Sequence, residues 1–342
     1  LFRSIRFVGL LLVFFSISIY KLSSQEIVAV DRQLDVKNPY QGNILNEIAI
    51  TPSGNPINYF FVEPIQSKDK EKKQNKKRKR DREDYFTKRK KPYGWIYSVS
   101  AGWMGRLPDT TRLKDISIPG THDSGSLFGS WLHAQTQTWS ILSQLKTGIR
   151  YLDIRCRANG SEFSIQHGLV FQKLMFDDVM EDIVAFLKEQ PTETIVMRVK
   201  NEFIPKKGSQ PFQEIWDNYV NLYANYFYRG DNSNATLGDV RGKIFVMCNA
   251  DCNGFGMTYD EDSYIQDWYK ITSEDHMFRI RKDLASISSK MDSIVKFIDI
   301  ADTSSKWVLN HLSGTEGMSP PSVAKITNPL AYSYIGKDRK SV

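Results

Sequence analysis

Cysteine is scarce in this chain of 342 residues, which has only three: Cys156, Cys248 and Cys252. No CxxC pair stands beside another or beside a histidine cluster, which excludes the common zinc modules. Three cysteines are also too few for a disulfide-stabilised scaffold. One bridge between Cys248 and Cys252 is possible, but the sequence does not require it. A hydrophobic core must hold the fold, and 7 Trp, 16 Tyr and 19 Phe are available to build it.

The chain also lacks a hydrophobic run of about 20 residues, the length that a membrane-spanning helix needs. Its main apolar stretch, residues 7–20, follows Arg3 and Arg6 and is interrupted by glycine and serine. This arrangement is typical of a secretory signal. We predict that residues 1–24 form a signal peptide or signal anchor. The protein is then expected to be secreted or extracellular and membrane-associated.

Only one segment of the chain carries an excess of basic residues. The net charge is +7, yet residues 68–91 hold fourteen Lys and Arg against five acidic residues, which leaves the remaining chain at −2. A folded domain with this balance has no broad basic surface, so we expect no nucleic acid among its partners. Residues 25–92 are predicted to be a poorly ordered linker with a basic run. That run is either solvated or in contact with anionic lipid headgroups.

Residues 93–342 have the pattern of a folded domain in which strands and helices alternate. Strands are predicted at 116–118, 148–156, 163–167, 194–200, 243–248, 264–271 and 306–312, and helices at 177–190, 211–227, 274–297 and 321–334. Such alternation predicts a parallel sheet of the α/β class. The length is close to the ~250 residues of a (β/α)8 barrel.

Polar side chains gather where three of these strands end. His122 and Asp123 follow the first strand, Asp153 and Arg155 lie on the second, and His167 ends the third. In a barrel the carboxyl ends of the strands form one rim, where active sites are built. Two imidazoles can supply a general base and a general acid, and an arginine can neutralise a phosphate. The cluster predicts phosphoryl transfer without a metal. Three other histidines are expected to be ordinary: His133, His276 and His311.

The order of these segments resembles the X domain of phosphatidylinositol-specific phospholipases C in its bacterial-type form. The matching segments are LKDISIPGTHDS at 113–124, GIRYLDIRC at 148–156, SIQHG at 164–168 and RGKI at 241–244. The resemblance implies a distorted TIM barrel, (β/α)8. It also implies cleavage of phosphatidylinositol or its GPI-type glycosylated derivatives by intramolecular attack of the inositol 2-hydroxyl. The products would be diacylglycerol and inositol 1,2-cyclic phosphate.

The same resemblance assigns expected roles to individual residues. His122 matches the general base and His167 the general acid, with Asp123 hydrogen-bonded to His167. Arg155 matches the residue that neutralises the phosphate, and Asp153 stands beside it. Three positions match residues that hold the inositol ring: Lys200, Asp267 and Tyr269.

No metal or other cofactor is expected. Calcium-dependent relatives have asparagine after the first histidine and carboxylates on the second strand. Here Asp123 follows His122, and Arg155 occupies the position of a calcium ligand. Since a fixed guanidinium can replace the charge of the cation, the resemblance implies calcium-independent cleavage.

The sequence departs from the family pattern at two places. An arginine that contacts inositol after the RGKI strand is replaced by Asn249, so we expect weaker or rearranged inositol contact there. No segment after Tyr334 resembles the last barrel strand, whose aspartate orients the base histidine. We therefore expect this chain, as printed, to lack that strand, which leaves His122 without its orienting partner.

A lipid substrate requires contact with a membrane surface. The segment SLFGSWL at 126–132 offers four apolar side chains: Leu127, Phe128, Trp131 and Leu132. They are expected either to insert at the headgroup level or to pack inward as a short helix. Two alternatives to the enzyme remain. One is a non-catalytic X-domain protein that binds inositol lipids, and the other is a metal-dependent phosphodiesterase on a related barrel, against which the absence of an ExD motif argues.

Overall fold

The computed structural model describes residue 81 and residues 101–130, 134–272, 285–301, 303–316 and 318–337. The predicted signal segment 1–24 and, apart from residue 81, the predicted linker 25–92 lie outside these residues. Within the described part of the chain, no helix is long and apolar enough to cross a membrane.

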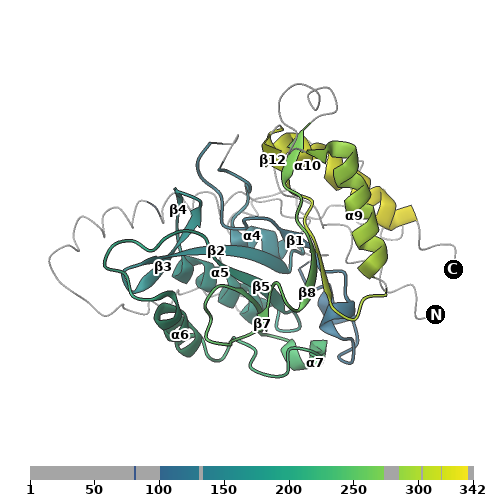
Figure 1. Cartoon of the computed structure of the whole chain (residues 1–342). Coiled ribbons are helices and arrows are strands. Elements are labelled where there is room, and N and C mark those ends of the chain that lie inside the picture. Colours follow the sequence, from purple (N-terminus) through teal and green to yellow (C-terminus); the bar gives the residue numbers. More distant parts are fainter. Residues whose placement is uncertain are drawn as a thin grey trace, which may run out of the picture.

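A seven-stranded sheet forms the centre of the molecule (Figure 1). Its order is β4-β3-β2-β5-β6-β7, with β1 paired to β2. The strands are β1 (Gly120–Thr121), β2 (Tyr151–Asn159), β3 (Glu162–His167), β4 (Val170–Met175), β5 (Ile195–Asn201), β6 (Ile244–Asn249) and β7 (Met257–Thr258). The pairs β1–β2, β2–β5, β5–β6 and β6–β7 are parallel, as the alternation predicted.

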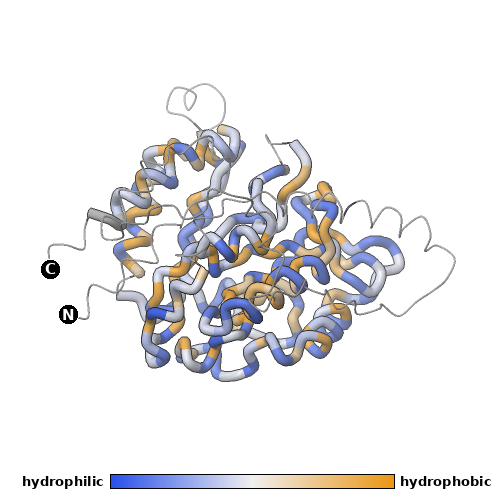
Figure 2. Tube along the Cα trace, turned by 180° about the vertical axis from the view of Figure 1, so that it is seen from behind, coloured by the Kyte–Doolittle hydropathy of each residue, from blue (hydrophilic) through white to orange (hydrophobic). Residues whose placement is uncertain are grey.

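Helices cover one face of this sheet. They are α4 (Ile141–Lys146), α5 (Phe176–Glu189) and α6 (Phe212–Leu222), and α7 (Leu237–Val240) precedes β6. The apolar face of α5 is buried in one core with alternate residues of β5, such as Ile195, Met197 and Val199. Ring contacts among Phe163, Phe176 and Trp216 fill this core. Figure 2 shows hydrophobic stretches alternating with hydrophilic ones along the trace, as expected for elements with one buried face.

The other face of the sheet carries the polar residues. Across the neighbouring strands β2, β5 and β6, Arg155 pairs with Lys200 and Lys200 with Asn249, which forms one row. Two residues earlier along the strands, Asp153 pairs with Arg198 and forms a second row. Successive strand residues point to opposite faces. The side chains of these two rows therefore leave the helix-covered core and share one side of the sheet.

The C-terminal part adds two smaller sheets and two helices. Strands β8 (Ser263–Gln266) and β11 (Trp307–Asn310) pair in parallel, and β9 (Lys270–Thr272) lies between β10 (Ala285–Ser286) and β12 (Thr315–Glu316). Helices α9 (Ile287–Ala301) and α10 (Pro320–Lys337) pack beside them (Figure 1). Among the described residues these sheets do not join the central sheet into a closed barrel.

Several predicted elements need correction. The 163–167 strand is not parallel, because β3 turns back antiparallel on β2. Asp153 and Arg155 lie in the middle of β2, which continues past the site into this hairpin. The first strand is only Gly120–Thr121, after a 3-10 turn at Leu113–Asp115. Strand β4 was not predicted, and the 264–271 segment splits into β8 and β9.

Candidate active site

A tight turn after β1 presents His122 and Asp123. The Asp123 backbone has φ 46°, a left-handed conformation that aspartate adopts more readily than most residues. Its amide donates to Asp153 Oδ2 at 3.0 Å. The carbonyl of His122 accepts a hydrogen bond from the Gln137 side chain at 2.7 Å. The turn is thereby fixed against β2 before any ligand binds.

Arg155 forms ion pairs with three carboxylates of the site. Its Nε lies 2.7 Å from Asp123 Oδ1, and its terminal nitrogens lie 3.2 Å from Asp153 Oδ2 and 3.2 Å from Glu202 Oε1. Only 11% of its side chain is exposed. A guanidinium can donate in several directions of one plane, which suits this three-carboxylate setting.

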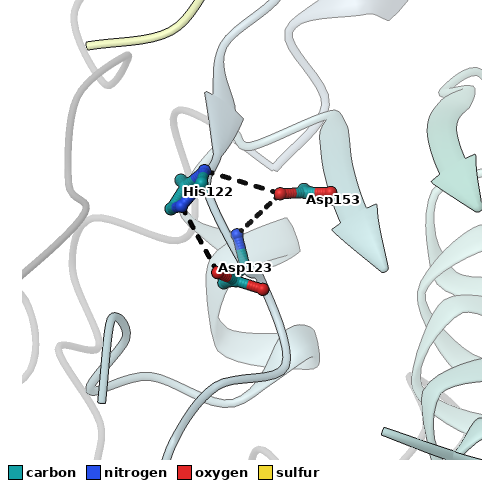
Figure 3. A group of neighbouring side chains, drawn as sticks. All are labelled: His122, Asp123 and Asp153. Atoms are coloured by element: carbon teal, nitrogen blue, oxygen red, sulfur yellow. Dashed lines mark hydrogen bonds and ion pairs between the residues drawn. The ribbon is translucent and has the colours of Figure 1, made fainter. Parts of the chain in front are cut away.

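His122 lies between two carboxylates, one at each ring nitrogen (Figure 3). Nδ1 is 3.5 Å from Asp153 Oδ2, and Nε2 is 3.3 Å from Asp123 Oδ2 and 3.4 Å from Arg155. The contact with Asp153 is an ion-pair distance and not a hydrogen bond, since Nδ1 has no hydrogen-bond partner among the described residues. At Nε2 the arginine can only donate, so this nitrogen is the acceptor of the ring. The expectation that His122 lacks the aspartate of a last barrel strand stays a prediction, and Asp153 on β2 is the carboxylate nearest to Nδ1.

His167 faces the same aspartate from the β3 hairpin. Its Nδ1 hydrogen-bonds to the Ala134 carbonyl at 2.8 Å, so this nitrogen carries the proton and donates it. Its Nε2 lies 3.6 Å from Asp123 Oδ2. Asp123 thus stands between the two imidazoles, and both Nε2 atoms point to one carboxylate oxygen.

Burial and the two arginines set the protonation states. Burial alone would raise the pKa of Asp153, but Arg155 and Arg198 hold it well below its ordinary value. Burial raises the pKa of Asp123 to about 6, although Arg155 acts in the opposite direction. Burial and then Arg155 lower the pKa of His122 well below its ordinary value. His122 is consequently neutral near pH 7, the state that a general base requires.

Three of these residues are close enough to bind a metal ion. His122, Asp123 and Asp153 each offer a ligand atom, and these atoms lie within 4.8 Å of one another. The carboxylates, however, already pair with Arg155 at 2.7 and 3.2 Å. The guanidinium thus supplies positive charge to these carboxylates, a role that a cation could otherwise fill.

Comparison with known proteins identifies the family. The sequence profile of the "Phosphatidylinositol-specific phospholipase C, X domain" matches residues 112–249. A 1-phosphatidylinositol phosphodiesterase of Listeria monocytogenes is 38% identical over 233 residues, which cover 62% of this chain and 68% of that protein. This chain belongs to the X-domain family of phosphatidylinositol-specific phospholipases C. A Staphylococcus aureus relative of the same description is 35% identical over 191 residues, 59% of its length.

Solved structures agree with the sequence matches. The phosphatidylinositol-specific phospholipase C from Listeria monocytogenes has a TM-score of 0.57 at 34% identity, over 67% of this chain and 85% of that one. A Staphylococcus aureus structure reaches 0.58 at 27% identity, over 68% and 85%. These likenesses confirm the predicted fold class, a distorted TIM barrel, although the described strands of this chain do not close.

The three predicted ring-binding residues occupy different surroundings. Lys200 pairs with Glu202 Oε2 at 2.7 Å, and Glu202 connects it to Arg155. Asp267 follows β8, and one of its carboxylate oxygens is buried without a hydrogen-bond partner among the described residues. Tyr269 is 47% exposed. Its side chain has no hydrogen bond to the described residues of the cluster.

The sequence reasoning did not single out Arg198 of β5 or Glu202, which directly follows that strand. Glu202 accepts the amide of Gly168 at 3.0 Å besides pairing with Arg155. Arg198 pairs with Asp153 Oδ1 at 3.3 Å and donates to Asn249 Oδ1 at 2.5 Å. Arg198 shares the strand face of Lys200, and Glu202 continues the same alternate spacing one residue past the strand, a signal that the sequence did contain. A guanidinium therefore reaches Asn249 from the neighbouring strand.

A disulfide closes the loop that begins with Asn249. Cys248 and Cys252 are bridged, the pairing that the sequence left open, and Cys156 is a buried free thiol. Asn249 lies inside this short ring and also donates to Asp260 at 3.0 Å. The bridge thus restrains the residue that contacts Arg198.

Proposed function

We propose that this chain cleaves phosphatidylinositol, or its glycosylated derivatives, by intramolecular attack of the inositol 2-hydroxyl on phosphorus. The observation that carries the proposal is the arrangement of two histidines around one aspartate beside a buried arginine. Both Nε2 atoms lie within 3.6 Å of Asp123 Oδ2, and Arg155 lies 2.7 Å from the other oxygen. This arrangement supports a base, an acid and a phosphate-neutralising cation that act around one point.

In the proposed reaction, His122 Nε2 removes the proton of the 2-hydroxyl while that oxygen forms a bond to phosphorus. The bond between phosphorus and the glycerol oxygen breaks, and His167 Nε2 gives its proton to the departing oxygen. Diacylglycerol leaves and inositol 1,2-cyclic phosphate remains. General acid–base catalysis of this kind contributes about 10²–10⁴ to a rate.

Arg155 is proposed to stabilise the negative charge on the non-bridging phosphate oxygens. A fixed donor in a water-poor site needs no reorganisation during the reaction and is worth more than in bulk water. Asp123 would hold the His167 imidazolium, and Asp153 would hold His122. The support for calcium independence is the Arg155 guanidinium, which already pairs with the carboxylates that a cation would need.

The inositol ring is proposed to lie between Lys200 and Asp267, with Tyr269 at the open side. Charged groups that bind ring hydroxyls favour a polyol headgroup over choline or ethanolamine. The half-exposed Tyr269 suits a position at the mouth of the site. Both free phosphatidylinositol and a glycosylated form share this headgroup, so the proposal covers both.

Exposed apolar side chains support contact of this rim with a membrane. Three of them follow site residues by one or two positions: Leu169 after His167, Ile204 after Glu202, and Trp268 after Asp267. They are 73%, 70% and 55% exposed. Apolar and aromatic side chains at such positions can enter the headgroup region of a bilayer. A peripheral lipid contact at the rim would bring the substrate directly to the two histidines.

The sequence left two alternatives open for the segment 126–132, and its described part packs inward at Leu127. Leu127 is fully buried in the core, so it cannot insert into lipid. Phe128 is half-buried and lies 4.9 Å below the ammonium of Lys173. Trp131 and Leu132 lie outside the described residues. The apolar contact is therefore proposed for the residues that follow β3, β5 and β8 instead.

An extracellular location is proposed for this protein. The support is the signal-like segment 1–24 together with the Cys248–Cys252 bridge, since disulfides persist in oxidising compartments. A protein outside the cell would meet phosphatidylinositol on membrane surfaces or in glycosylated anchors.

The separate roles of the two histidines provide the test. A water-soluble inositol phosphodiester with an alkyl leaving group needs acid assistance, whereas one with a nitrophenyl leaving group does not. His122→Ala should lose turnover on both compounds, and His167→Ala only on the alkyl compound. Circular dichroism should show that both variants remain folded. Equal losses on the two compounds for His167→Ala would contradict its role as the acid.

A further inference from the structure

A third histidine lies next to the proposed base. His311 follows β11, whose residues Trp307 and Leu309 line the same side of the central sheet as the site. Its ring centroid is 6.1 Å from that of His122, with the rings nearly perpendicular at 87°. The sequence analysis assigned no function to His311, because no candidate site residue is near it in the sequence. The pairing of β11 with β8 brings it close to His122.

The backbone of His311 is fixed at both of its polar atoms. Its amide donates to the carbonyl of Gln266 at 2.9 Å. Its carbonyl accepts from the Gln266 side chain at 3.0 Å and from the ammonium of Lys290 at 2.6 Å. Lys290 is completely buried on α9. A buried ammonium is costly unless it is hydrogen-bonded, so this helix holds the ends of β8 and β11 firmly in place.

One nitrogen of the imidazole is occupied and the other is not. Nε2 lies 2.7 Å from the hydroxyl of Tyr259, whose ring packs under the Arg198 guanidinium at 3.9 Å. Among the described residues, none hydrogen-bonds to Nδ1 of His311. The side chain is partly exposed, and the charges of Asp267 and Asp153 both act on it. The ring therefore lies beside the base with Nδ1 available to a ligand.

We propose that His311 binds the substrate, with Nδ1 hydrogen-bonded to the ring hydroxyl next to the attacking one, the inositol 3-hydroxyl. The inference rests on the proposed function. A ring polyol whose 2-hydroxyl contacts His122 must direct a neighbouring hydroxyl toward an adjacent wall of the site. Hydrogen-bond reach is about 2.6–3.2 Å. Two such bonds, one to each imidazole, fit between rings whose centroids are 6.1 Å apart.

The protonation state suits this role. Burial lowers the pKa of His311, and Arg198 and Lys290 act in the same direction against Asp267 and Asp153. A neutral imidazole can either donate to or accept from a hydroxyl group, depending on its tautomer. With Tyr259 holding Nε2, the ring cannot turn freely, so it would orient the polyol rather than transfer the reacting proton.

The test compares two substrates in two variants. His311→Phe keeps a flat ring but loses both nitrogens, whereas His311→Asn keeps a polar atom near the place of Nδ1. The substrates are a soluble inositol phosphodiester and its 3-deoxy analogue. On the first compound, His311→Phe should lower kcat/KM by about tenfold and His311→Asn by much less. On the 3-deoxy analogue, wild type and His311→Phe should be equal.

The outcomes separate the inference from the proposed function. If wild type cleaves neither compound, the proposed function fails. If wild type is active and His311→Phe loses the same factor on both compounds, His311 is only structural and the inference is wrong. Unchanged activity of His311→Phe on the first compound would also overturn it.

A measurement on the wild-type protein guards against misfolding of the phenylalanine variant. Addition of myo-inositol to ¹⁵N-histidine-labelled protein should shift the His311 ring resonances, which are assigned by their absence in His311→Asn. 3-Deoxy-inositol should leave them in place. Tyr259→Phe should give a smaller loss of activity than His311→Phe, and the exposed Tyr264→Phe serves as its matched control. Equal shifts with both polyols would contradict the contact.

Discussion

Replacing Arg155 by lysine tests the electrostatic centre of the site. The guanidinium spans Asp123, Asp153 and Glu202 at 2.7–3.2 Å, while a lysine ammonium is a single point charge that cannot span all three. The variant keeps the charge but loses at least one charge-assisted hydrogen bond. Such a bond contributes about 1.5–3 kcal/mol. Because a tenfold change in rate corresponds to about 1.4 kcal/mol, kcat should fall about tenfold to 150-fold.

The assay is turnover of a soluble inositol phosphodiester in EDTA, with kcat and KM measured separately. The loss should appear in kcat, because the arginine is expected to act most strongly on the charge that develops in the transition state. Arg157→Lys is the matched control, since Arg157 lies on the same strand and donates to the Ile204 carbonyl rather than to the site. An unchanged kcat in Arg155→Lys, or a loss confined to KM, would refute this reasoning.

Three further predictions follow from burial and charge. Because the pKa of Asp123 is raised to about 6, its carboxylate gains a proton as the pH falls through that value. The kcat of the wild type should therefore decline below about pH 6. Asp123→Asn should have a low kcat at every pH and should not show that decline. Arg150→Met leaves the fully buried Glu193 carboxyl without its ion-pair partner, so urea unfolding should reveal a loss of about 3–5 kcal/mol, and a loss under 1 kcal/mol would contradict the ion pair's role. Leu169→Ser combined with Ile204→Ser should weaken binding to phosphatidylinositol vesicles at least tenfold in a sedimentation assay. The same double variant should spare cleavage of a soluble substrate, and equal loss on both would argue against membrane contact.

The sequence predicted the residues of the site better than their positions in the fold. His122, Asp123, Arg155 and His167 stand in short motifs, and the structure brings them together. The antiparallel turn of β3 was missed because an isolated five-residue strand pattern does not reveal its direction. This changes the position of His167 in the fold. The residue lies at the end of a strand that runs antiparallel to β2, and not at the end of a third parallel strand.

Residues that depend on distant pairing escaped the sequence analysis. His311 meets His122 only because β11 pairs with β8, and no local pattern encodes that pairing. Asn249 was predicted to give weaker or rearranged inositol contact, and the sequence did not show that the Arg198 guanidinium of the adjacent strand donates to it. Alternation along β5 places Arg198 and Lys200 on one face, with Glu202 directly after the strand, so that part could have been predicted. Their partners on β2 and β6 depend on register, which a single strand does not specify.

The most direct test of the account is phosphorus-31 NMR of phosphatidylinositol mixed micelles incubated with this protein in EDTA. We predict a downfield resonance of the five-membered cyclic phosphodiester that grows with time in wild type and is absent in His122→Ala. A signal that grows only after calcium is restored would contradict the role of Arg155. Direct formation of a phosphomonoester with no cyclic product, or equal turnover by His122→Ala, would contradict the proposed reaction itself.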